Sequence, residues 1–93
     1  MRQITRQAVS AFMNGYDYKS GNTQVRDNAL YLHGNKIAEW RNDGELWISN
    51  GGWSSNVTKE RLNGIPGVHI QQKDWIWYLN GHHWQGQWVK VER

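Results

Sequence analysis

Four histidines and eight acidic residues supply the groups in this 93-residue chain that could carry acid–base or metal chemistry. His82 and His83 are adjacent, and neighbouring residues of a strand point to opposite faces, so a strand cannot aim both at one ion. His33 and His69 lie far away in the sequence, and no carboxylate stands at ligand spacing beside the pair. We therefore predict no metal site and no cofactor, and we expect two exposed loop imidazoles.

The acidic residues show no catalytic pattern. Aspartate is favoured in turns because its side chain bonds nearby backbone amides, and four aspartates fall in predicted turns: Asp17, Asp27, Asp43 and Asp74. The sequence specifies neither a Ser-His-Asp or Cys-His arrangement nor a phosphate-cradling glycine motif. We predict a protein that is not an enzyme. A small hydrolase is the remote alternative, and it would need an activity that depends on His82 or His83.

The segment 51–63 is the best local candidate for ligand binding. It joins two glycines, Trp53 and a short predicted helix over 57–63 with Asn56 as its cap. A helix N-terminus can hold a phosphate or carboxylate, and Lys59 and Arg61 could extend that contact. Alternatively, the Trp53 ring plugs the gap between a strand and the helix, and the glycines permit the tight exit.

Composition limits the class of protein. The length fits one domain over residues 1–93, and the absence of cysteine excludes disulfides and thiolate metal sites. The net charge of +3 is dispersed, which favours polyanions only mildly. No apolar run is long enough to span a bilayer and no signal peptide is visible, so we expect a cytoplasmic protein without a membrane partner.

The positioning elements follow from hydrophobic periodicity. A helical pattern over 4–13, with Thr5 as its cap, precedes a polar loop over 16–22, and the period then changes to two. The predicted strands are 23–26, 29–33, 36–41, 45–49, 68–72, 75–79 and 87–92, with 75–79 central because it is apolar on both sides. We predict an α+β fold, an antiparallel, strongly twisted or curled sheet of about six or seven strands with two short helices, in the order α-β-β-β-β-α-β-β-β.

Alternation along these strands separates aliphatic from aromatic residues. One side collects Leu30, Leu32, Ile37, Leu46, Ile48, Val68, Ile70, Val89 and Val91. The other collects Tyr31, His33, Ala38, Trp40, Trp47, His69, Trp88 and Lys90. The aliphatic side is the predicted core. The aromatic side is either a second core layer or an exposed platform for a ligand or partner.

Two strings, LHGNKIA over 32–38 and TKERLNGIPGV over 58–68, are distinctive. With Ser20-Gly21-Asn22-Thr23 and Trp77-Tyr78-Leu79-Asn80-Gly81, they resemble a family of small uncharacterised accessory proteins of tailed bacteriophages. The resemblance covers most of the chain beyond Asn14 and brings no activity or site residue with it. It implies a protein that acts in the cytoplasm of a bacterial host.

We hypothesise that the protein binds a host protein or nucleoprotein assembly stoichiometrically, as host-takeover and anti-defence inhibitors do. The predicted contact residues are Trp40, Trp47, Trp53, Lys59, Arg61 and Trp88. The alternative is a nucleic-acid-binding module, whose residues would be Tyr31, Lys36, Trp40, Arg41, Trp88 and Lys90. The oligomeric state is open, because edge strands such as 23–26 or 87–92 could pair across a dimer axis.

Overall fold

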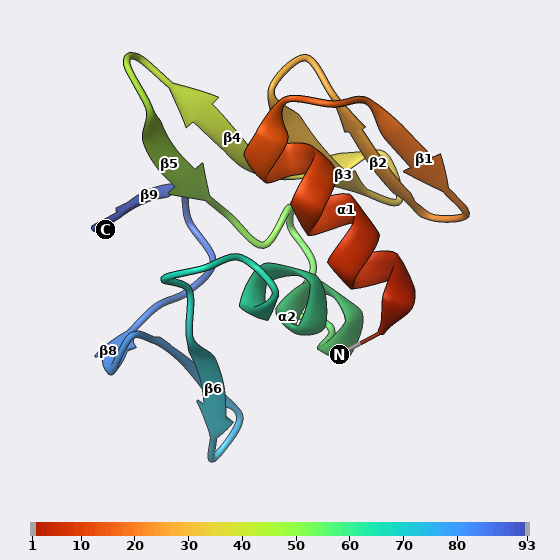
Figure 1. The fold of residues 1–93 in the computed structure, drawn as a ribbon. Coiled ribbons are helices and arrows are strands. Elements are labelled where there is room, and N and C mark those ends of the chain that lie inside the picture. Colours follow the sequence, from red (N-terminus) through yellow and green to blue (C-terminus); the bar gives the residue numbers. More distant parts are fainter. Residues whose placement is uncertain (1, 93) are drawn as a thin grey trace.

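The computed structural model describes residues 2–92 and contains two antiparallel sheets and two helices (Figure 1). The elements are α1 (Gln3–Asn14), β1 (Tyr18–Ser20), β2 (Thr23–Arg26), β3 (Ala29–Leu32), β4 (Asn35–Arg41), β5 (Glu45–Ile48), α2 (Asn56–Asn63), β6 (Ile70–Lys73), β7 (Ile76–Leu79), β8 (His82–His83) and β9 (Val89–Val91). The predicted α+β class is confirmed. The strands form a six-stranded sheet, β1-β2-β3-β4-β5-β9, and a three-stranded sheet, β6-β7-β8, in place of one sheet.

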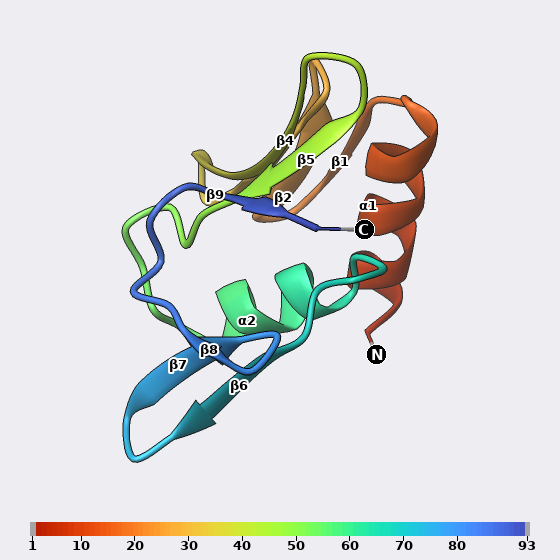
Figure 2. The same cartoon turned by 90° about the vertical axis from the view of Figure 1, so that its left-hand side faces the viewer.

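Both helices lie on one side of the six-stranded sheet, and the three-stranded sheet lies on the far side of α2 (Figure 2). The core between these layers combines Phe12 from α1 with Leu30, Leu46 and Ile48 from the large sheet. Ile65, Val68, Ile70 and Leu79 continue the same cluster into the small sheet. One apolar cluster therefore joins all the layers.

A β-bulge decides which side chains of β4 enter the core. Leu30 pairs with Ala38 and Tyr31 pairs with Lys36, which leaves Ile37 as an extra residue on β4. Ile37 and Ala38 are consequently both buried, and the alternation is reversed from there on. Trp40 pairs with Leu46 and thus lies on the core side, so its predicted place on the opposite face is wrong.

The two helices cross closely at Gly64, at the C-terminal end of α2. A Cβ atom placed there would lie 2.6 Å from Thr5 Cγ2, which explains the glycine. Thr5 is fully buried within α1, and the N-cap of α1 is Arg2, so the prediction of Thr5 as a cap is wrong. The cap of α2 is Ser55 in place of Asn56, because the Ser55 hydroxyl accepts a hydrogen bond from the Thr58 amide.

The remaining differences concern short strands and edges. The predicted loop over 16–22 contains β1, which makes β1 and β9 the edges of the large sheet and β2 an inner strand. β7 is central in the small sheet, as predicted for 75–79. His82 and His83 lie in β8 and not in a loop, and both side chains are exposed. Neither helix within residues 2–92 is long and apolar enough to cross a membrane.

Candidate functional site

The side of the six-stranded sheet that faces away from the helices carries rings and cations together. Registered neighbours point to the same side, so Tyr31 lies with Lys36, Trp47 with Lys90, and Arg41 with Glu45. We define the aromatic–cationic face by three rings, four cations and two carboxylates: Tyr31, Trp47, Trp88, Arg26, Lys36, Arg41, Lys90, Glu39 and Glu45. Neither helix covers this face, because both lie on the opposite side of the sheet (Figure 2). The Tyr31 and Trp47 rings are half-buried, and Trp88 is exposed.

Each ring of this face is covered by a cation. The Arg41 guanidinium lies 4.3 Å from the centre of the Trp47 ring and 5.1 Å from that of Trp88. The Arg26 guanidinium lies 4.5 Å from the Tyr31 ring, with the Lys36 ammonium at 5.9 Å. Such cation–π contacts contribute roughly 0.5–2 kcal/mol each, depending on desolvation, and they hold the rings in place.

Two carboxylates lie among these cations. Glu39 bonds Arg41 and Lys36, and Glu45 lies 3.5 Å from Lys90 Nζ. Partial burial alone would raise the pKa of Glu39, but hydrogen bonds from Arg41 and Lys36 outweigh it and hold that pKa below its usual value. Hydrogen bonds from Asn42 and Trp47 likewise lower the pKa of Glu45. The face therefore holds two permanent negative charges at neutral pH between its four positive ones.

The Trp40 side chain packs against the core and is not part of this face. Its ring stacks on Phe12 with centroids 5.3 Å apart, and its indole Nε1 donates to the Phe12 carbonyl oxygen at 3.0 Å. These contacts fasten the C-terminal part of α1 to β4. The structure thus separates Trp40 from Trp47 and Trp88, with which the sequence grouped it.

Arg61 is also internal, with only 2% of its surface exposed. Its guanidinium donates to Thr23 Oγ1 at 3.0 Å and to Thr5 Oγ1 at 2.8 Å, and it pairs with Glu60. The predicted position of Arg61 at an accessible helix edge is wrong, because its side chain joins α1, α2 and β2. Burial alone would raise the pKa of Glu60, but hydrogen bonds from Thr5, the Arg2 amide and Arg61 lower it overall.

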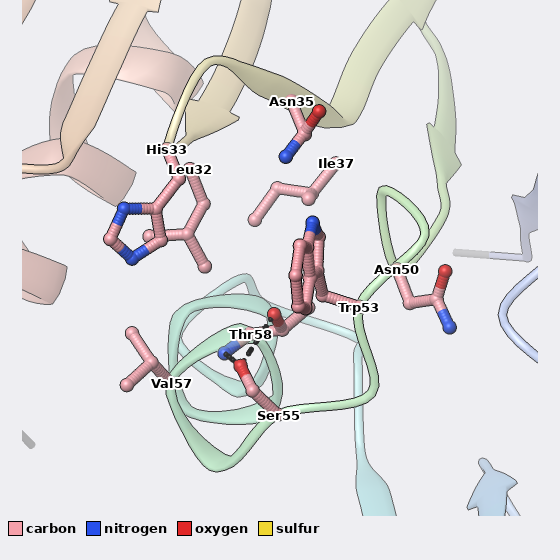
Figure 3. A pocket seen from close by; sticks show the side chains of 9 residues that line it. All are labelled: Leu32, His33, Asn35, Ile37, Asn50, Trp53, Ser55, Val57 and Thr58. Atoms are coloured by element: carbon pink, nitrogen blue, oxygen red, sulfur yellow. Dashed lines mark hydrogen bonds between the residues drawn. The ribbon is translucent and has the colours of Figure 1, made fainter.

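Trp53 borders a groove of about 520 Å³ between the β3–β4 turn and the start of α2. Figure 3 shows its indole standing below Ile37 and beside Thr58, with His33 and Val57 across the opening. The ring is 64% exposed, so it does not plug the gap. Lys59 points elsewhere, to Gln72 at 3.0 Å and to the Trp77 ring at 5.9 Å. The predicted anion site at this helix start is therefore not assembled from Lys59 and Arg61.

A further aromatic residue stands out at the tip of the β6–β7 hairpin. Trp75 is 91% exposed, and its φ of 68° puts a bulky side chain in the left-handed region, which costs about 1–2 kcal/mol for an L-residue. The predicted strand over 75–79 includes Trp75, so that prediction is wrong for this residue. Asp74, a turn residue directly before it, is the sequence signal that indicates the tip.

No cluster suited to metal chemistry is formed by the described part of the chain. Within residues 2–92, no three His, Cys, Asp or Glu side chains gather closely enough to hold an ion. The His83 ring lies 6.1 Å from that of Tyr78, and His82 is exposed at the surface of the small sheet. We therefore take the aromatic–cationic face as the candidate binding surface.

Comparison with known proteins places the chain in a viral group. A family model described as Kyanoviridae Gp96 protein matches residues 1–92. The chain belongs to this family. Its members are proteins of cyanophages, so the predicted origin in a tailed-phage protein family is confirmed. No curated protein and no solved structure matches the chain.

Proposed function

We propose that this phage protein is a non-enzymatic accessory protein that binds a host protein or nucleoprotein assembly stoichiometrically in the host cytoplasm. The observation that supports it is the placement of Arg41 between Trp47 and Trp88, 4.3 and 5.1 Å from their rings. Trp, Tyr and Arg are the residues that most often dominate protein interfaces. Here all three types lie on one open sheet face, fixed before any partner arrives, which reduces the entropy lost on binding.

The charges of the face favour a protein over a bare polyanion. Glu39 and Glu45 are held ionised among its cations, so they offset part of the attraction that those cations have for a phosphate backbone. A protein surface that presents both carboxylates and cations can match this pattern, and such matching contributes specificity and association rate. A protein that captures host machinery in this way would inhibit or redirect it.

The test is a pull-down from infected host lysate, with and without nuclease, using the natural chain and a Trp47→Ala, Trp88→Ala double variant. We expect the natural chain to retain a defined host protein after nuclease treatment and the double variant to lose it. Tyr16→Ala is the matched control, since Tyr16 is an exposed aromatic on the α1–β1 connection, away from the face. Equal capture by all three chains would contradict the proposal.

Nucleic-acid binding by the same face is the second candidate. Its support is that Tyr31, Lys36, Arg41, Trp88 and Lys90 all lie there, whereas Trp40 does not. The dependence of affinity on salt concentration distinguishes the two candidates. Binding to single-stranded nucleic acid should weaken with a log–log slope of about −0.7 for each phosphate neutralised, and a protein complex anchored by aromatic residues should respond weakly.

A further inference from the structure

At the tip of the β6–β7 hairpin, Trp75 adopts a left-handed backbone conformation that favours glycine or asparagine. Both central residues, Asp74 and Trp75, have positive φ, 54° and 68°, as type I′ turns require. Three other hairpins use the same turn and place Asn or Gly in its second position: Asp27-Asn28, His33-Gly34 and Asn80-Gly81. Trp75 is the exception, and a glycine or asparagine would fit its backbone better.

Packing within the protein does not compensate for this conformation. The ring of Trp75 is 91% exposed, whereas Trp77, two residues along the same strand arm, is 6% exposed and packs beside Trp84 at 6.1 Å. Ile76, next to Trp75, is also exposed. Figure 2 shows that the β6–β7 hairpin protrudes from the rest of the molecule. Trp75 in its turn and Ile76 at the start of β7 therefore place two exposed apolar side chains at the end of this hairpin.

The charge around this point is balanced. Lys73 and Asp74 flank it with opposite signs, and both side chains are exposed. The two charged side chains of the turn therefore give it no net charge that would attract a phosphate. A polyanion or an anionic membrane would gain no electrostatic attraction at the tip, so an apolar, indole-sized pocket in a protein fits it best.

We propose that the β6–β7 hairpin is an insertion element, and that Trp75 enters an apolar pocket on a partner protein, with Ile76 packing at the rim. The inference rests on the proposed function only in requiring a protein partner, and it uses a surface separate from the aromatic–cationic face. Beside the ring, a hollow of about 310 Å³ between Gln72, His83 and Gln85 is available to a side chain of that partner.

The first arm of the test measures stability. Trp75→Gly and Trp75→Asn should each lower the equilibrium constant of unfolding severalfold, because they relieve the left-handed backbone without removing a buried contact. Urea unfolding followed by circular dichroism checks this. A loss of stability in both variants would show that Trp75 serves the fold and would overturn the inference.

The second arm measures binding. A chain with p-benzoylphenylalanine in place of Trp75 is irradiated in host lysate, with the same substitution at Tyr16 as the control. The protein crosslinked only from position 75 is then purified and titrated with the natural chain, Trp75→Gly and the Trp47→Ala, Trp88→Ala double variant. We expect one-to-one binding that Trp75→Gly weakens at least thirtyfold, as for a hot-spot residue.

The outcomes separate the two proposals. Loss of affinity in Trp75→Gly with the double variant unchanged supports the hairpin alone. Loss in the double variant with Trp75→Gly unchanged overturns the insertion element and leaves the sheet face standing. Crosslinking to nucleic acid only, binding to anionic vesicles only, or no specific crosslink from position 75 also overturns the inference.

Discussion

The aromatic–cationic face and the β6–β7 hairpin display tryptophans in opposite ways. On the sheet face, Trp47 and Trp88 lie against Arg41, and the carboxylate of Glu45 accepts from the Trp47 indole at 3.2 Å. At the hairpin tip, Trp75 is 91% exposed in a backbone conformation that disfavours it. The first region is a broad charged surface whose rings and charged groups contact one another. The second is one exposed apolar side chain at the end of a hairpin.

This difference shows that the number of tryptophans says little until each is placed. Trp77 and Trp84 are core residues of the small sheet, and Trp40 fastens α1 to the large one. Only the residues left outside the core are accessible to a partner, and the two proposed surfaces would bind one by separate means. A broad face gives orientation through many weak contacts, whereas an inserted ring gives affinity through one desolvated contact.

The most disruptive change to this comparison is Trp77→Ala. It removes a buried ring from β7, the strand that follows Trp75 in the hairpin, and we expect a loss of about 3–5 kcal/mol in the free energy of unfolding. Denaturant unfolding measures the total loss of stability, and amide hydrogen exchange shows which strands lose protection. Protection should fall first in β6, β7 and β8, while β3, β4 and β5 keep theirs. Uniform loss across both sheets would show that the two regions are not separable.

Glu60→Gln weakens the contacts of Arg61 that join α1, α2 and β2. Glu60 is the carboxylate partner of the buried Arg61, and breaking such a pair costs about 3 kcal/mol, the lower end of the usual range because Glu60 is partly exposed. The pKa of Glu60 is lowered in the folded state, so its contribution is present above its unperturbed value of 4.5 and is lost as the pH falls through the folded value.

Thermal unfolding of both chains between pH 3 and pH 7 checks this expectation. The difference in unfolding temperature between the natural chain and Glu60→Gln should be largest near neutral pH and should disappear in acid. Glu92→Gln is the control for loss of a carboxylate alone, because Glu92 is exposed just after β9. A difference that is the same at every pH would assign the effect to lost packing rather than to ionisation.

The sequence predicts most of the fold because turn residues and alternation act locally. It gives the bounds of β2 correctly and places β3, β4, β5 and α2 within one or two residues. The prediction fails where the position of a side chain depends on contacts with elements that are distant in the sequence. The extra residue Ile37 is visible only in the pairing of β3 with β4, and it turns Trp40 inward. Arg61 is buried because Thr5 and Thr23 meet it from other elements. The turn position of Trp75 is not predicted, because type I′ turns favour asparagine and glycine and the tryptophan favours a strand.

The smallest effect is expected from Glu39→Gln on the aromatic–cationic face. Glu39 joins Lys36 and Arg41 at a partly exposed position, so the substitution should cost less than about 1 kcal/mol of stability. Raising the salt concentration should shrink that cost, because salt screens exposed pairs. The same change removes a negative charge from among the cations, so any affinity of the face for a single-stranded oligonucleotide should rise at low salt. An unchanged affinity would indicate that phosphates do not approach this face, and it would leave a protein as the partner that best fits the sheet.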